Sequence, residues 1–171
     1  MAETAIVITV PEAEPVVGGL CRAHTKAGRE GMPPHVTLLI PFADSDALPL
    51  AEVRDVLEAF APFDFALTES RRFEPPSGPI LWLAPDPATP FVELTEALVR
   101  AFPDYPPYGG AFDQIVPHLS VAATRDSRLP QRIERELAPA LPIAATADAA
   151  TIVTRRNGRW EPHSTVPFAG R

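Results

Sequence analysis

One short pattern occurs twice in this chain of 171 residues, and it constrains the fold more than any other feature. The copies are Pro34-His35-Val36-Thr37-Leu38 and Pro117-His118-Leu119-Ser120-Val121. Aliphatic and β-branched residues that follow an entrance proline predict a buried strand at each copy. Alternate side chains of a strand point to opposite faces, so each histidine shares a face with the hydroxyl residue two positions later. These neighbours lie about 7 Å apart, and both can reach one phosphate-sized group.

The repetition changes how the two histidines are interpreted. A lone histidine in an apolar strand is usually structural, with a satisfied hydrogen bond. Here two of the four histidines in the chain fall in matching contexts. If the two strands lie side by side, two imidazoles and two hydroxyls converge on one point. The other two, His24 on a predicted apolar helix stripe and His163 in a polar setting, are interpreted as structural or exposed.

The paired pattern resembles the mark of the 2H phosphoesterase superfamily, two His-apolar-[Ser/Thr]-apolar motifs (HxTx) about half a chain apart. This group includes the LigT-like 2′-5′ RNA ligase proteins and the cyclic phosphodiesterases. The resemblance extends over nearly all of residues 1–171, which we interpret as a single bilobal domain. It implies an α+β fold of two pseudo-symmetric lobes, each an antiparallel β-sheet with outer helices. The two motif strands would line the active groove between the lobes.

The remaining patterns predict an alternation of strands and helices. Helices are expected at 14–27, 49–60, 89–102 and 128–138, and strands at 5–10, 63–73, 80–83, 143–148, 150–155 and 160–168. Asn157-Gly158 predicts a tight hairpin. We interpret this order as a loose internal duplication in which each half holds a strand–helix–strand unit and one motif. A doubly wound parallel sheet is not predicted, because no Gly-x-Gly-x-x-Gly follows a strand.

The segment that precedes the second motif is rich in aromatic, proline and glycine residues, from Asp104 to Asp113. Its rings could pack against the core, or Tyr108 and Phe112 could form a wall against which a nucleobase stacks. The two interpretations are compatible, since one ring could serve each purpose.

Composition narrows the classes of function. Apolar residues make up 46% of the chain, but no run approaches the roughly 18–20 residues of a membrane span. The single cysteine, Cys21, and the lack of a signal-peptide pattern favour a cytoplasmic location. The net charge of −7 argues against extended nucleic-acid binding and leaves a small nucleotide or an RNA 3′ end as the expected partner. We expect a monomer and no membrane association.

The resemblance implies cleavage of a 2′,3′-cyclic phosphate, a reaction that two histidines and two hydroxyls can serve. One of His35 and His118 would act as base and the other as acid, on opposite sides of the phosphorus. Thr37 and Ser120 would donate hydrogen bonds to the non-bridging oxygens. No metal and no cofactor is expected, because the sequence has no metal-ligand spacing, no P-loop and no Gly-x-Ser-x-Gly. Two alternatives stay open: 2′-5′ RNA ligation, and a non-catalytic module that binds RNA ends or cyclic nucleotides.

Overall fold

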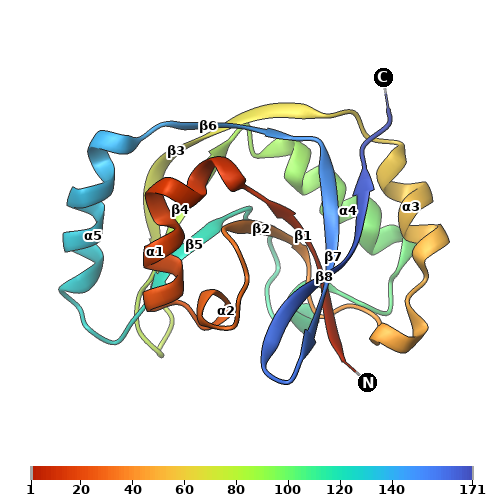
Figure 1. Cartoon of the computed structure of the whole chain (residues 1–171), viewed down its shortest axis with the longest axis horizontal. Coiled ribbons are helices and arrows are strands. Elements are labelled where there is room, and N and C mark those ends of the chain that lie inside the picture. Colours follow the sequence, from red (N-terminus) through yellow and green to blue (C-terminus); the bar gives the residue numbers. More distant parts are fainter. Residues whose placement is uncertain (1, 171) are drawn as a thin grey trace.

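The computed structural model describes residues 2–170 and contains two four-stranded antiparallel sheets with outer helices (Figure 1). The first sheet has the order β2 (His35–Leu39), β1 (Glu3–Thr9), β7 (Ala149–Arg156), β8 (Arg159–Pro167). The second has the order β5 (Leu119–Ala123), β4 (Ile80–Asp86), β3 (Phe63–Phe73), β6 (Ile143–Ala147). The α+β prediction is confirmed, and each motif strand forms one edge of its sheet.

The two sheets are related by matching strand–helix–strand units. The helix α1 (Glu14–His24) connects β1 to β2, and α4 (Thr89–Ala101) together with the loop that follows it connects β4 to β5. Each helix contacts the motif strand of the other sheet: α1 packs against β5, and α4 against β2. The Thr95 hydroxyl donates to the Leu38 carbonyl at 2.9 Å, and the Cys21 thiol to the Ser120 carbonyl at 3.4 Å. These contacts hold β2 and β5 beside each other at the middle of the molecule.

Burial along the motif strands follows the predicted alternation. Val36, Leu38, Leu119 and Val121 are at most 2% exposed and belong to a hydrophobic core that includes residues of both sheets. The residues between them stay half-buried on the opposite face. A second, smaller cluster lies under β1 and β7 and contains Ala5, Val7, Met32, Val153 and Trp160. The strands therefore present their histidine and hydroxyl side chains away from the core.

The remaining helices are α2 (Lys26–Arg29), α3 (Leu50–Glu58) and α5 (Leu129–Leu137), with short 3₁₀ turns at Pro11–Ala13, Ser45–Ala47, Pro107–Gly110 and Ala138–Ala140. The predicted helix 14–27 is wrong in one respect, because it breaks at Thr25. The Thr25 hydroxyl donates to the Cys21 carbonyl at 2.8 Å and accepts from the Gly28 amide at 2.9 Å, which ends α1 and begins α2. Within residues 2–170, no helix has the length and apolar character needed to cross a membrane.

The duplication holds for the two strand–helix–strand units with their motifs, but the remaining strands do not divide between two halves of the chain. The first sheet is built from both ends of the chain, because β7 inserts between β1 and β8. The second sheet is built from the middle, residues 63–147. The order of strands along the chain does not show which sheet each strand joins, because β6 and β7 are consecutive in sequence but belong to different sheets. The pseudo-symmetry is therefore one of space, with corresponding strands in different chain order.

Candidate active site

The two motif histidines are held in the same way. His35 lies at the start of β2, and its Nδ1 is 2.8 Å from the Pro33 carbonyl oxygen. His118 immediately precedes β5, and its Nδ1 is 2.7 Å from the Val116 carbonyl oxygen. A carbonyl only accepts, so Nδ1 carries the proton and donates in each ring. In each neutral imidazole the lone pair is therefore on Nε2, the nitrogen that can exchange a proton with a ligand.

The surroundings keep both rings neutral near pH 7. Burial lowers the pKa of His35 and of His118, because the charged imidazolium loses hydration. The bond from each Nδ1–H to its carbonyl partly opposes this effect. Repulsion from His118 lowers the pKa of His35 further, so the two rings interact electrostatically across β2 and β5. An anionic group placed between them would stabilise the protonated form of either ring.

The hydroxyl residues of the two motifs lie on the same faces as the histidines. Thr37 and Ser120 are both half-buried, and each is two positions beyond its histidine. The Thr37 hydroxyl interacts with the phenol of Tyr108. The Ser120 hydroxyl makes no hydrogen bond to another residue within 2–170, whereas the Ser120 carbonyl accepts from the Cys21 thiol. Both hydroxyls can turn toward a ligand without breaking the strand.

Tyr108 lies directly over this arrangement. Its ring stacks on the His118 imidazole, with centroids 6.5 Å apart and an angle of 25° between the planes. Its backbone is left-handed, with φ 53° and ψ 34°, and its amide donates to the Ile40 carbonyl at the end of β2. Burial of the hydroxyl end raises the pKa of Tyr108, and the interaction with Thr37 opposes that rise. One side chain thus connects the hydroxyl of the first motif with the histidine of the second.

Phe112 stands at the outer edge of the same loop. It is 69% exposed and meets Tyr108 edge to face, with centroids 5.6 Å apart. A cavity of about 640 Å³ opens beside these rings and His118, and Phe73, Ile80 and Val116 complete its apolar wall. The structure therefore places both predicted aromatic residues at the rim of the site, with Tyr108 nearest the histidine.

Two aromatic neighbours of His118 were missed from the sequence. Phe73 on β3 meets the imidazole edge to face at 5.1 Å, and Trp82 on β4 lies 5.9 Å from it. Phe73 and Trp82 also stack on each other at 4.7 Å. Only the cross-strand register, in which Trp82 faces Ser120, brings these residues to the second motif. An aromatic residue in a short apolar strand was visible in the sequence, but the residue opposite it was not.

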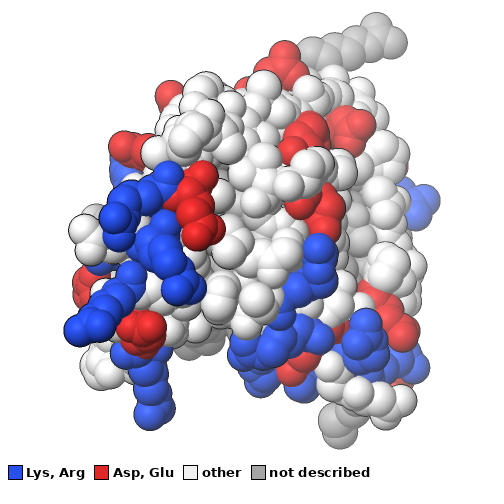
Figure 2. Space-filling model, turned by 60° about the vertical axis from the view of Figure 1, so that its left-hand side comes forward, with Lys and Arg blue, Asp and Glu red and all other residues white. Residues whose placement is uncertain are grey.

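Charged side chains near the surface are unevenly distributed. Figure 2 shows Lys and Arg gathered in groups on the lower part of one face, interleaved with Asp and Glu. The surface ion pairs include those of Arg72 with Glu134 and of Arg155 with Glu30. Among residues 2–170, no three His, Cys, Asp or Glu side chains are grouped so that they could hold a metal ion. Burial raises the pKa of the Cys21 thiol to about 11, so this thiol is un-ionised at neutral pH.

Fold and site together define a two-histidine phosphoesterase architecture, and comparison with known proteins agrees. The family model described as the 2′-5′ RNA ligase superfamily matches residues 9–159. The chain belongs to this superfamily, and the resemblance to 2H phosphoesterases drawn from its two motifs is confirmed. No curated protein sequence is recognisably similar to it.

Solved structures show the same fold over nearly the whole length. TT0787 of Thermus thermophilus has a TM-score of 0.68 at 18% identity, with 99% of both chains covered. E. coli LigT complexed with 3′-AMP has a TM-score of 0.62 at 15% identity, with 98% of both chains covered. Kluyveromyces marxianus Usb1 has a TM-score of 0.56 at 14% identity, covering 97% of this chain and 98% of its own.

Proposed function

We propose that this protein is a metal-independent phosphodiesterase that opens 2′,3′-cyclic phosphates of nucleotides or RNA ends. The observation that carries the proposal is the matched pair of Nδ1–H bonds from His35 and His118, which leaves an Nε2 lone pair on each motif strand. Two neutral imidazoles on adjacent strands suit a reaction that needs one proton acceptor and one proton donor. Membership of the 2′-5′ RNA ligase superfamily supports phosphodiester chemistry at this site.

The proposed reaction is an in-line displacement. One Nε2 removes a proton from water as the water oxygen bonds to phosphorus. The bond from phosphorus to one ribose oxygen breaks on the opposite side, and the second imidazole, protonated when the anionic substrate binds, gives its proton to that oxygen. Thr37 and Ser120 donate to the two non-bridging oxygens, whose charge must be held in the transition state. Which histidine acts as the base in hydrolysis stays open, because their hydrogen bonds are equivalent.

Tyr108 and Phe112 are proposed to hold the nucleobase. The cavity beside them is apolar, and every base offers a face that an aromatic ring can stack on. Structures of relatives with 3′-AMP, with ATP and with uridine monophosphate support a nucleotide-sized ligand. The proposed partners are therefore a small cyclic nucleotide or the 3′ end of an RNA.

Ligation of RNA ends through a 2′-5′ bond is the second candidate, favoured by the equivalent anchoring of the two histidines. In that direction an RNA hydroxyl replaces water as the nucleophile, and the same acid and base serve. A binding module without turnover is the third candidate.

A panel of nucleoside 2′,3′-cyclic phosphates, with and without a 5′-hydroxyl RNA acceptor, separates these candidates. Phosphorus NMR then identifies each product as a 2′-phosphate, a 3′-phosphate or a 2′-5′ diester. His35→Ala and His118→Ala are each expected to lower kcat about 10²–10⁴-fold, the usual contribution of one positioned proton-transfer group. EDTA is expected to leave the rate unchanged. Binding without product in the native protein would leave only the module, and full activity in either variant would refute the acid–base scheme.

A further inference from the structure

A second cavity shares the wall residue Val116 with the aromatic cavity beside Tyr108 and Phe112. Its volume is about 480 Å³, and it is bounded by β3, β4 and the segment 115–117 that leads into the second motif. Trp82 joins it to the active site, because this side chain lines the second cavity and also contacts the His118 ring. Cross-strand pairs place Ser120, Trp82 and Arg71 in one row across β5, β4 and β3. Arg71 is thus two strand spacings, about 10 Å, from Ser120.

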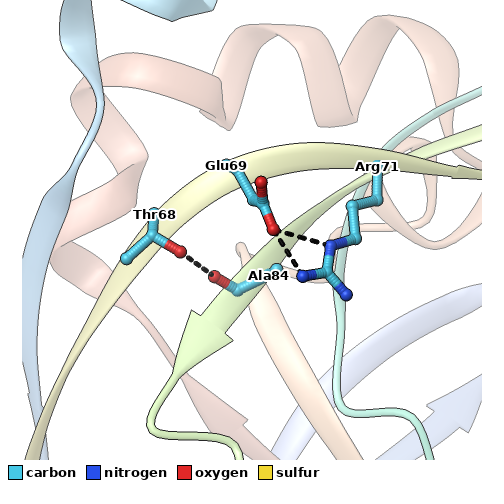
Figure 3. Close-up of polar contacts among 4 residues, drawn as sticks. All are labelled: Thr68, Glu69, Arg71 and Ala84. Atoms are coloured by element: carbon cyan, nitrogen blue, oxygen red, sulfur yellow. Dashed lines mark hydrogen bonds and ion pairs between the residues drawn. The ribbon is translucent and has the colours of Figure 1, made fainter.

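The cavity has both hydrogen-bond donors and acceptors. Figure 3 shows Glu69 and Arg71 joined on β3, with one carboxylate oxygen of Glu69 accepting from Nε and Nη2 of Arg71. The third guanidinium nitrogen, Nη1, makes no hydrogen bond to any residue within 2–170. Thr68 donates to the Ala84 carbonyl at 3.4 Å, a long contact (Figure 3). Since the side chains of Glu69 and Arg71 are more than half exposed, a ligand can share or replace their contact.

A further donor lies beneath this pair. Trp82 is 4% exposed, and its Nε1 is buried with no hydrogen-bond partner among residues 2–170. The guanidinium of Arg71 is 5.9 Å from the centre of its ring. A buried N–H without an acceptor costs free energy, which a ligand that offers an acceptor would recover. Trp82 is a wall residue of this cavity, and a small side-chain shift would bring its buried nitrogen to a ligand.

The charges select the kind of ligand. Two carboxylates, Glu69 and Asp86, face one cation, Arg71, so a phosphate would meet net repulsion. Ala84, Pro85, Val92, Val116 and Pro117 supply apolar walls. Acceptors, donors and apolar walls together match the edge and face of an unstacked nucleobase. A base with an exocyclic amino group suits the carboxylates best, because the amino group donates and a carboxylate only accepts.

Resting on the proposed function, we propose that this cavity binds a second nucleobase, that of the nucleotide on the 5′ side of the terminal cyclic phosphate. The substrate is then an RNA end of at least two nucleotides. Tyr108 and Phe112 hold the terminal base, and Glu69, Arg71 and Trp82 hold the next one. Cytosine, adenine or guanine is preferred over uracil at this second position.

The test compares kcat/KM for uridine 2′,3′-cyclic phosphate with that for the dinucleotides CpU and UpU ending in the same cyclic phosphate. Native protein is expected to favour the CpU substrate over the UpU substrate about tenfold, the discrimination expected of one side-chain-to-base pair. Glu69→Gln replaces one acceptor oxygen by an amide NH₂ at constant size, which can donate to a uracil carbonyl, and is therefore expected to abolish that preference. Trp82→Phe keeps the ring and removes the N–H, and should lower the ratio of dinucleotide to mononucleotide turnover.

Arg72→Gln is the matched control, because Arg72 is the next residue on β3 but pairs with Glu134 of α5. Its substrate ratios should equal those of the native protein. Calorimetric binding of the corresponding 2′-deoxy dinucleotide 3′-phosphates gives a readout that needs no turnover. If mononucleotide is cleaved and all ratios are equal in native and Glu69→Gln proteins, the second site is refuted and the proposed function stands. If nothing is cleaved, the proposed function is refuted. A higher affinity for the 2′-deoxy CpU analogue than for the UpU analogue, lost in Glu69→Gln, would then still support the cavity, whereas equal affinities would refute it.

Discussion

Replacing Tyr108 with alanine should weaken substrate binding and rehydrate His118 at the same time. The ring is 40% exposed and lies beside the aromatic cavity, where it is available to a base. Stacking on one aromatic ring contributes about 1–3 kcal/mol, so KM for a nucleoside cyclic phosphate should rise about 5- to 150-fold. Tyr108→Phe keeps the ring and removes only the hydroxyl beside Thr37, which should lower the free energy of unfolding by about 0.5–1.5 kcal/mol.

The effect on His118 supplies a second readout. The Tyr108 ring stacks on one face of that imidazole, and burial is the main cause of its lowered pKa. In Tyr108→Ala the pKa of His118 should move up toward its ordinary value near 6.5, while the Phe variant should hold it low. NMR titration of the histidine Cε1–H resonances measures this directly. Kinetics with base-free ribose 2′,3′-cyclic phosphate provide the control, because this substrate has no ring to stack.

Glycine and alanine variants of Tyr108 separate the effect of losing the ring from the effect of the strained backbone. Tyr108 is left-handed, with φ 53°, a conformation that costs about 1–2 kcal/mol for a residue with a Cβ. Tyr108→Gly should therefore be more stable than Tyr108→Ala by about 1 kcal/mol, with the same KM. An unchanged KM together with an unmoved pKa of His118 in the alanine variant would refute the role given to this ring. If KM in the alanine variant rises as much for the base-free substrate as for the nucleoside cyclic phosphate, stacking on a base is refuted.

Three further predictions concern stability and pH. Gly78→Ala should lower the free energy of unfolding, measured by urea melts, by about 2–3 kcal/mol, because φ is +114° and a Cβ would lie 2.2 Å from a main-chain oxygen. Gly109→Ala is the control: with φ +65° and open space around it, it should lower the same free energy by about 1 kcal/mol. Thr95→Val removes the buried bond from α4 to β2 and should cost about 1 kcal/mol, with an intact circular dichroism spectrum as control. In the folded protein the pKa values of His35 and His118 lie below their ordinary value of about 6.5, so just below that pH the unfolded chain binds more protons than the folded one. The free energy of unfolding should therefore fall as the pH drops below about 6.5, and level off below the folded pKa values. A variant with both histidines changed to glutamine should show a shallower slope.

The motif strands were predictable because their information is local. An entrance proline, alternating polarity and a histidine two residues before a hydroxyl determine which side chains leave the core together. The surroundings of His118 were not predictable in this way. Phe73 and Trp82 reach it only through the pairing of β3, β4 and β5, which includes an irregularity in register between Leu81 and Trp82. A bulge of this kind changes which side chains face the groove without leaving a clear signal in the sequence.

The break between α1 and α2 shows a second limit of sequence patterns. The apolar stripe runs as far as His24, and the first helix-ending signal after it is Gly28, so the sequence favoured one helix up to residue 27. The hydroxyl of Thr25 instead competes for main-chain partners on both sides, as short polar side chains do at helix ends. The preceding helix is thereby kept short, and Gly28 follows it closely enough that a Cβ would lie 2.2 Å from the Cys21 carbonyl.

The sheet built from both ends of the chain has a consequence for biosynthesis. In the order of synthesis the strands β3 to β6 all come before β7, so the second sheet has all its strands before the first sheet does. The strand β1 precedes the whole second sheet in the chain, whereas its neighbour β7 follows that sheet. Until β7 pairs with it, one edge of β1 is open, and an open edge of this kind attracts other strands. Late closure of the first sheet, through contacts far apart in sequence, should make it the slow step of folding.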